Sequence, residues 1–277
     1  MNIKTWRNDA AARITDTCGE EYACDADWLL CDALRCGRGG LRLRMQEELS
    51  PDLLDALNQA LERRLTGEPL QYIEGFAWFM GHRFLVTKDV LIPRPDTEIL
   101  AEEAIRLAGD RNPAVLDLCT GSGAIACSVA LACPGAQVIA SDISPNALRV
   151  AKENARELGA KVEFLQGDLF EPVRGAKFGL IACNPPYLSA EDMRCLSGEV
   201  RHEPRLALEG GEDGLAFYRR IAEEVRDYLV PGGALLLEVG AGQAQAVLAL
   251  LGGGRTIRDF NGIERVVVFG ASGIPRR

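Results

Sequence analysis

Apolar residues follow two different periodicities in this chain, one before and one after residue 113. In the first part they recur every three or four positions, as on an amphipathic helix, and the clearest run begins at Ser50-Pro51 and ends before Gly67. Serine suits a helix cap, and proline suits the first helical turn. Asp27–Leu34 predicts a second helix, and Gly37–Gly40 predicts a loop. Residues 1–73 are therefore expected to form a helical domain.

Residues 74–95 have a different character. Aromatic and β-branched side chains on either side of Gly81 predict a β-hairpin. Pro93-Arg94-Pro95 can continue neither a helix nor a central strand, so we expect a rigid connector there, followed by a helix that opens at Asp96. Arg94 and Glu98 are expected either to pair with each other and lock this connector in place or to contact a substrate.

Beyond Pro113, short apolar runs alternate with helical ones. The strands are expected at 114–119, 137–142, 162–166, 178–183, 234–239, 256–260 and 265–269, and the helices at 123–133, 145–158, 215–229 and 243–251. Near-continuous apolar strands that alternate with helices are typical of an α/β fold with a parallel sheet covered on both faces. The last two strands have no helix between them, which predicts an antiparallel edge hairpin. We expect this mostly parallel sheet to form one domain, residues 96–277.

The charge balance is acidic along the whole chain. The net charge is −9; residues 1–90 carry 11 Lys and Arg against 15 Asp and Glu, and the remainder carries 20 against 25. A duplex-DNA binder normally has a basic face that contacts many phosphates. No apolar run approaches the roughly 20 residues that span a bilayer, and the N-terminus lacks the apolar core of a secretory signal. We therefore expect neither a nucleic-acid nor a membrane partner.

The cysteines and histidines do not favour a metal site. None of the nine cysteines forms a C-x-x-C pair, and there are only two histidines, whereas zinc ligands usually come in close pairs. Thiols scattered over apolar positions are typical of a reduced, cytoplasmic protein. We therefore expect no metal, a cytoplasmic location, and cysteines that fill the core.

A glycine-containing turn joins the first predicted strand of the α/β domain to its helix. In Cys119-Thr120-Gly121-Ser122-Gly123 the two glycines permit a tight turn that a ligand can approach closely. Asp142 ends the next strand, where a carboxylate can accept hydrogen bonds from both hydroxyls of a ribose. After the third strand, Asp168 is suited to accept from an adenine amine, and Leu169 is suited to cover the face of the base. The turn predicts a nucleoside site, although it also fits a dinucleotide fingerprint.

A second motif, Asn184-Pro185-Pro186-Tyr187, follows the fourth strand at the end of the sheet where ligands bind in open α/β folds. The prolines fix the backbone, so the side-chain oxygen of Asn184 and the carbonyl of Pro185 form two adjacent acceptors that suit a planar NH2 group. Tyr187 offers an aromatic face for stacking. Hydrogen bonds to both N–H groups push electron density onto a delocalised nitrogen and strengthen as positive charge develops on it, which favours the transition state.

These motifs together resemble the class I S-adenosylmethionine-dependent methyltransferases, which have a Rossmann-like fold. More closely, the chain is similar to the HemK-type peptide chain release factor glutamine methyltransferases over nearly its whole length. Beyond the Asn184–Tyr187 motif, the stretches that carry this resemblance are Gly67–Ile73, Phe79–Val86, Val90–Glu98, Glu203-Pro204 and Ala207–Leu215.

The resemblance implies a substrate, a cofactor and roles for individual residues. The methyl acceptor would be the glutamine of a Gly-Gly-Gln tripeptide in release factors, docked by the helical domain, and the protein would be a monomer. S-adenosylmethionine would be held by Cys119-Thr120-Gly121-Ser122-Gly123, Asp142, Asp168, Leu169 and Asn184. Asn184-Pro185-Pro186-Tyr187 would hold the glutamine, with Asn184, Pro185 and Tyr187 as the catalytic group. Glu203 would either order the loop after Tyr187 or touch the glutamine.

The chain departs from the family at one position of the cofactor turn, because Cys119 stands where glycine is common. We expect this position not to need a positive φ, so that cofactor binding survives. Three other functions remain open on the sequence alone: methylation of an exocyclic base amine in DNA or RNA, which the same motif can serve by taking a flipped base; methylation of a glutamine in a ribosomal protein; and a non-enzymatic module that binds the release factor or the ribosome.

Overall fold

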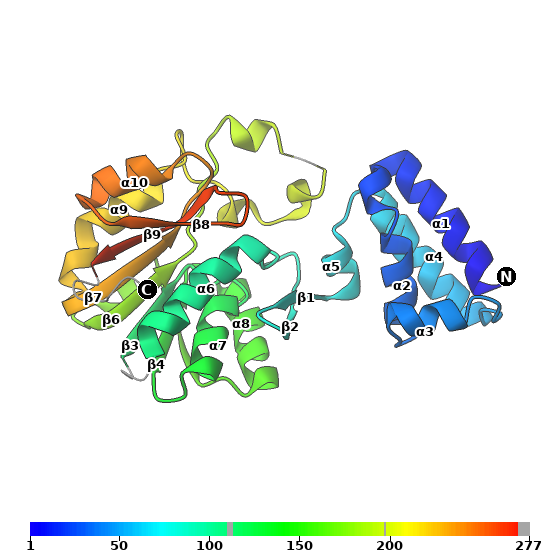
Figure 1. The fold of residues 1–277 in the computed structure, drawn as a ribbon, viewed down its shortest axis with the longest axis horizontal. Helices are drawn as coiled ribbons and strands as arrows, with labels where there is room; N and C mark the ends of the chain where they lie inside the picture. The colour runs from blue at the N-terminus through cyan, green and yellow to red at the C-terminus, as the bar shows by residue number, and fades with distance from the viewer. Residues whose placement is uncertain (110–112, 197, 271–277) are drawn as a thin grey trace. The chain divides into compact units, whose positions relative to one another are not determined.

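The computed structural model describes residues 1–109, 113–196 and 198–270 and divides into two compact units (Figure 1). Met1–Gly75 and residues 198–202 form a helical unit. Residues 76–196 and 203–270 form an α/β unit. A short segment of the later sequence is therefore part of the N-terminal helical unit.

The helical unit packs short amphipathic helices around an apolar core. They are α1 (Ile3–Cys18), α2 (Asp25–Ala33), α3 (Arg38–Leu43), α4 (Pro51–Leu65) and α5 (Leu70–Glu74). Ser50 caps α4 as predicted, since its side-chain oxygen accepts from the Leu53 N–H at 3.4 Å. The predicted loop at 37–40 is wrong: α3 begins there because Leu41 buries its side chain in the core, which outweighs the low helix propensity of the glycines.

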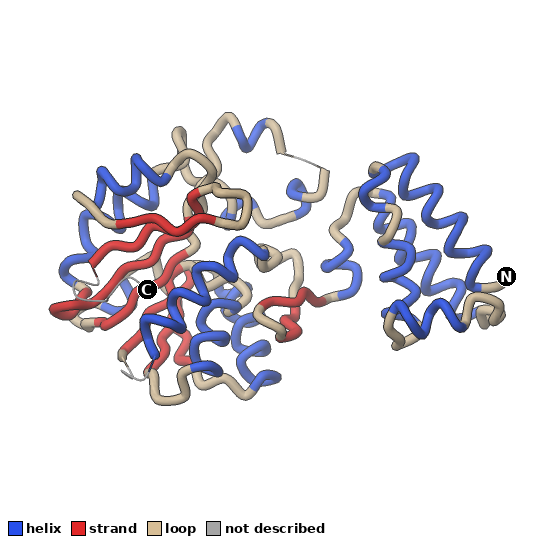
Figure 2. The backbone as a smooth tube through the Cα atoms, in the orientation of Figure 1, coloured by secondary structure: helices blue, strands red, loops and turns tan. Residues whose placement is uncertain are grey.

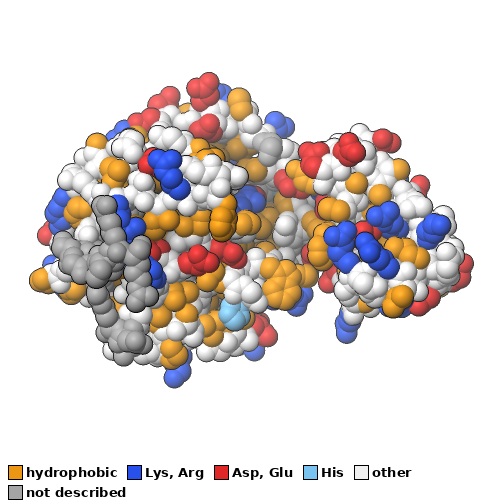
Figure 3. Space-filling view, viewed as in Figure 1, with side chains coloured by type: hydrophobic (Ala, Val, Ile, Leu, Met, Phe, Trp, Pro, Cys, Tyr) orange, Lys and Arg blue, Asp and Glu red, His pale blue; other side chains and the backbone are white. Residues whose placement is uncertain are grey.

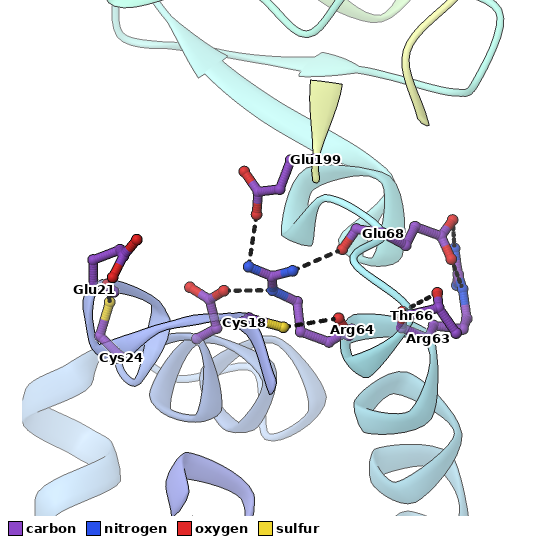
Figure 4. A network of polar contacts seen from close by, with 9 residues as sticks. Cys18, Glu21, Cys24, Arg63, Arg64, Thr66, Glu68 and Glu199 are labelled. Atoms are coloured by element: carbon purple, nitrogen blue, oxygen red, sulfur yellow. Dashed lines mark hydrogen bonds and ion pairs between the residues drawn. The ribbon is translucent and has the colours of Figure 1, made fainter. Parts of the chain in front are cut away.

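A buried arginine organises one end of this unit (Figure 4). The Arg64 side chain is fully buried, and its guanidinium donates to Asp25 at 2.6 Å and to Glu199 at 2.6 Å. It also donates to the Glu68 carbonyl at 3.3 Å and lies over the Tyr22 ring. These contacts hold residues 198–202 against the helices.

The α/β unit begins with a hairpin and continues as a seven-stranded sheet (Figure 2). The hairpin strands β1 (Phe76–Phe79) and β2 (His82–Leu85) pair antiparallel. The sheet has the order β5-β4-β3-β6-β7-β9-β8, and its strands are β3 (Ala114–Leu118), β4 (Gln137–Asp142), β5 (Val162–Gln166), β6 (Phe178–Cys183), β7 (Leu229–Glu238), β8 (Arg255–Arg258) and β9 (Glu264–Gly270). The first five strands in this order are parallel, and β9 is antiparallel to both its neighbours. The predicted mostly parallel sheet with an antiparallel edge is confirmed.

Helices cover both faces of this sheet, because its central strands are apolar on both sides. The helices are α6 (Pro95–Ala108), α7 (Ala124–Ala132), α8 (Pro145–Leu158), α9 (Ala216–Glu224) and α10 (Ala244–Leu251). Helices α6 and α7 pack on one face, and α9 and α10 pack on the other. The predicted helix at 215–229 is shorter than expected: α9 ends at Glu224, a 3-10 helix follows at Val225–Asp227, and β7 begins at Leu229.

The position of the functional site follows from the strand order. After β3 the chain runs outward through β4 and β5, then returns to β6 on the other side of β3. A crevice opens at such a switch point, outside the carboxyl ends of the strands. Leu118 pairs with Cys183, so the turn after β3 and the motif after β6 begin side by side.

Candidate active site

A cleft at the carboxyl ends of β3, β4 and β6 collects most of the predicted site residues. Those that line it are Cys119, Thr120, Gly121, Ser122, Asp142, Asp168, Leu169, Asn184 and Pro186. Gly123, Pro185 and Tyr187 are not among its lining residues. The predicted nucleoside turn and the predicted amide-binding motif thus contribute to one cleft, whose lining includes nine of the twelve predicted residues.

The turn after β3 is held in a conformation that needs positive φ at its first residue. Cys119 has φ 56°, so the expectation that this position does not need a positive φ is wrong. Gly123 has φ 80°, and a Cβ there would lie 3.1 Å from the Ala151 side chain on α8. Glycine at 123 therefore permits close packing of α7 on α8 as well as the turn itself.

Two carboxylates, Asp117 and Asp142, hold this turn in place through hydrogen bonds. Asp117 is buried, and its Oδ2 accepts from the Thr120 hydroxyl at 2.6 Å and from the Ala126 N–H at 3.1 Å. Burial raises the pKa of Asp117 to about 7. The two oxygens of Asp142 accept from the Gly121 and Ser144 N–H groups, each at 2.9 Å. Each carboxylate oxygen has two lone pairs, so Asp142 retains acceptor capacity for a ligand hydroxyl.

The adenine-binding residues predicted after β5 have a partner that the sequence did not indicate. Asp168 accepts from the Arg220 guanidinium at 2.7 Å. Arg220 and Phe217, both from α9, also line the cleft. Leu169 is buried beside them. No local motif marks Arg220 or Phe217, because α9 is brought to the cleft only by the fold.

Asn184 is the first residue of the Asn184–Tyr187 motif and directly follows β6. Its Nδ2 donates to the hydroxyl of Thr97 on α6 at 3.3 Å. Pro185 and Pro186 are buried, and Tyr187 is partly buried. Burial raises the pKa of Tyr187 to about 12, so its hydroxyl stays protonated at neutral pH. The Tyr187 carbonyl accepts from the Gln243 side chain at 2.9 Å, which ties the motif to α10.

The stretch 203–215 supports this motif from outside. Leu188 donates to the Leu208 carbonyl at 2.9 Å, and Gly210 donates back to Leu188 at 2.8 Å. Gly210 packs so tightly that a Cβ there would lie 2.7 Å from Tyr187 Cα. Residues 203–215, which form part of the family resemblance, therefore hold the backbone of the Asn184–Tyr187 motif in place.

The connector before α6 is held differently from the expected Arg94–Glu98 pair. Arg94 pairs with Glu203, and the same carboxylate accepts from the Ile92 N–H at 3.1 Å. Glu98 instead accepts from the Met80 N–H at 2.6 Å. Of the two roles expected for Arg94 and Glu98, the ion pair between them is wrong: Arg94 pairs with Glu203, which is distant in sequence, and Glu98 binds the Met80 N–H.

Comparison with known proteins settles which family carries this arrangement. Residues 5–75 match the family model "PrmC N-terminal domain", and residues 96–200 match "Methyltransferase small domain". A release factor glutamine methyltransferase from Geobacter sulfurreducens is 45% identical over 90% of this chain and 89% of that protein. One from Bordetella pertussis is 50% identical over 76% of this chain and 81% of that protein. The chain belongs to the release factor glutamine methyltransferase family.

The resemblance read from the sequence is thereby confirmed, and solved structures agree on the fold. A methyltransferase from Pyrococcus furiosus superposes with a TM-score of 0.54 at 18% identity, over 69% of this chain and 90% of that one. The class I methyltransferase fold expected for this family is confirmed.

Two further findings concern metal ligands and membrane-spanning helices. Within residues 1–109, 113–196 and 198–270, no group of three or more His, Cys, Asp or Glu side chains is placed to hold a metal ion. No helix in those same ranges is both long and apolar enough to cross a membrane. On the face of the α/β unit seen in Figure 3, Lys and Arg side chains lie among Asp and Glu side chains.

Proposed function

We propose that this chain transfers a methyl group from S-adenosylmethionine to the side-chain amide nitrogen of the glutamine in the Gly-Gly-Gln tripeptide of peptide chain release factors. Release factor glutamine methylation is the activity of its curated relatives. One observation carries the proposal for this chain: the Asn184 amide and the turn at 119–122 line the same cleft. The group proposed to bind the amide and the turn proposed to bind the nucleoside therefore line the same cleft.

The residues of the cleft fit S-adenosylmethionine chemically. Asp142 is fixed by two backbone N–H groups and retains lone pairs for the ribose hydroxyls. Leu169 and Phe217 offer apolar surface for the adenine, and Asp168 offers an acceptor for its amine. The rest of the cofactor would lie against the turn Cys119-Thr120-Gly121-Ser122-Gly123. When bound there, the cofactor supplies a methyl group on a positively charged sulfur.

The glutamine would be held by the motif after β6. The Asn184 Oδ1 and the Pro185 carbonyl would accept hydrogen bonds from the two N–H groups of the glutamine amide, and Pro186 and Tyr187 would flank its plane. These bonds strengthen as the nitrogen gains positive charge in attacking the methyl carbon. The C–S electron pair leaves with sulfur, and the nitrogen then loses a proton to water. Correct alignment of the reacting atoms alone can supply roughly 7–11 kcal/mol of the barrier.

The same proposal assigns a role to each part of the chain. Residues 1–73 would dock the release factor, 74–95 would connect, and 96–277 would catalyse. The protein would act as a cytoplasmic monomer with no metal and no nucleic-acid partner.

The decisive experiment incubates the purified protein with methyl-labelled S-adenosylmethionine and a release factor. We expect label on the wild-type factor and none on a factor with Gln→Ala in its tripeptide. Asn184→Ala should lower the rate by about 100-fold or more while preserving the circular dichroism spectrum. Asn261→Ala, at an exposed turn, is the matched control and should keep full activity. Label on the Gln→Ala factor, on DNA, on RNA or on a ribosomal protein instead would refute the proposal.

A further inference from the structure

We infer that Arg220 is a positioning residue that fixes the Asp168 carboxylate and thereby makes the cleft select a nucleoside whose base carries an amino group. The inference rests on the proposed function, since it concerns the proposed adenine end of the same cleft. Asp168 follows β5, Arg220 lies on α9, and both line the cleft. The Arg220 Nη2 donates to Asp168 Oδ2 at 2.7 Å. A charged donor and a charged acceptor therefore meet in the lining of the cleft.

Helix α9 holds Arg220 on a fixed part of the fold. Tyr218 and Ile221 of this helix are fully buried against the sheet, and the Tyr218 hydroxyl donates to the Glu238 carbonyl at 2.8 Å. Phe217 and Arg220 are three positions apart, so they lie on one face of the helix. The Arg220 guanidinium carbon is 5.9 Å from the centre of the Phe217 ring, and Phe217 also lines the cleft. An apolar ring and a cation thus lie side by side on one wall of the cleft.

The contact with Arg220 decides which way the Asp168 carboxylate points. A guanidinium carries only donors, so it holds Oδ2 of the carboxylate on its own side. The second oxygen, Oδ1, has two lone pairs of its own and is left to accept from a ligand. The amino group of a base donates and is complementary to this oxygen, whereas a keto oxygen in the same place would oppose it. The pair therefore favours adenine over a base with a keto group at that position.

The stability of the fold does not explain this ion pair. The side chains of Arg220 and Asp168 are 45% and 38% exposed, and ion pairs at such exposure add little to stability. A bound base that covers the pair would exclude water from it, and charged interactions strengthen when water is excluded. The pair would therefore act mainly in the liganded cleft. The adjacent Arg219 makes a similarly exposed pair with Asp213, but neither residue is among the described residues that line the cleft.

Calorimetric binding of two nucleosides to the whole protein tests the inference without a release factor. S-adenosylhomocysteine carries an amino group on its base, and S-inosylhomocysteine carries a keto group at the same position. We expect the wild type to bind the amino form about 10- to 100-fold more tightly, the range for one hydrogen bond to a charged group. Arg220→Met should lower this preference to about 3-fold or less, because Asp168 can then turn away into water. Arg219→Met is the matched control and should keep the wild-type preference.

Asp168→Asn tests whether Arg220 sets the orientation of its partner. Arg220 still needs an acceptor, so the new side-chain amide should turn its oxygen to Arg220 and its NH2 to the base. The preference should then reverse, with the keto form bound more tightly by about 3-fold or more. Adding Arg220→Met to Asp168→Asn should abolish this reversal, because the amide is then free to take either orientation.

The ratio of the two affinities decides the outcome. An ion pair with a purely structural role would weaken both ligands equally in Arg220→Met and leave their ratio unchanged, which would overturn the inference. The inference also fails if Arg219→Met loses the preference as well, or if Asp168→Asn still prefers the amino form. A wild-type protein that binds S-adenosylhomocysteine but transfers no methyl group to the release factor would refute the proposed function alone, and the ratio would still decide the role of Arg220.

Discussion

The backbone of Cys119 lies in the left-handed region, where a residue with a Cβ is disfavoured. Its φ is 56°, and a Cβ in the left-handed region costs roughly 1–2 kcal/mol. We predict that Cys119→Gly relieves this strain, partly offset by the greater freedom of glycine in the unfolded chain, for a net gain of about 0.5–1 kcal/mol over Cys119→Ala. Urea unfolding at pH 7.5 measures the difference.

The comparison with alanine isolates the backbone term, because both variants lose the sulfur and only alanine keeps the Cβ. S-adenosylmethionine should bind Cys119→Gly at least as tightly as wild type, as judged by isothermal titration calorimetry. If Cys119→Ala proves as stable as Cys119→Gly, the turn is not strained at this residue.

Single residues of the cleft were predictable where a strand end and a motif coincide. Asp142 ends one strand of the parallel sheet, and Leu169 and Asn184 follow two others. Parallel strands present their carboxyl ends at one edge of the sheet. Thr97 and Arg220 were not predictable as cleft residues, because each lies on a helix whose placement depends on long-range packing. The positive φ of Cys119 was also hidden, since nothing in the residue type signals it.

At the scale of elements, the segment 203–215 acts as a brace for the motif after β6. A Cβ on Gly210 would lie 2.7 Å from Tyr187 Cα and 2.8 Å from the Pro186 carbonyl oxygen, both backbone atoms that cannot rotate away. We predict that Gly210→Ala displaces the motif and lowers kcat by about 100-fold, the scale that a 1 Å misplacement can cause. Steady-state methyl transfer measures it.

Gly39→Ala is the matched control for this prediction. Gly39 lies in helix α3, has nothing within 4 Å of an added Cβ, and should tolerate alanine without loss of activity. Near-wild-type kcat in Gly210→Ala would mean that the segment yields and does not brace the motif.

The regular elements of the α/β unit were more predictable than those of the helical unit. Strands such as Phe178–Cys183 are apolar on both faces, so their pattern survives any detail of packing. Helix α3 was missed because its two glycines disfavour a helix, whereas the burial of Leu41 against the other helices stabilises it. The short helices therefore depend on tertiary packing, which the sequence pattern does not show. The strands of the sheet, by contrast, follow directly from the pattern of apolar residues.

At the scale of the whole molecule, the chain does not divide at a single point. Residues 198–202 belong with the helical unit although they lie within the sequence of the α/β unit. The ion pair that joins them, Arg64 to Glu199, spans 135 positions of sequence. No local pattern predicts such a pairing, so the sequence alone suggested one continuous domain from residue 96 onward.

Arg64 should accordingly control the stability of the helical unit. Its side chain is fully buried between Asp25 and Glu199, and removing one member of a buried ion pair leaves an uncompensated charge that costs roughly 3–5 kcal/mol. We predict a loss of this size in the free energy of unfolding for Arg64→Ala, seen as faster hydrogen exchange in α1, α2 and α4.

Arg13→Ala, which breaks the exposed pair with Glu62, is the control and should cost less than about 1 kcal/mol. Glu199→Gln should speed exchange mainly in residues 198–202, because Asp25 still holds Arg64. Equal exchange in Arg64→Ala and Arg13→Ala would show that the buried network does not stabilise the unit.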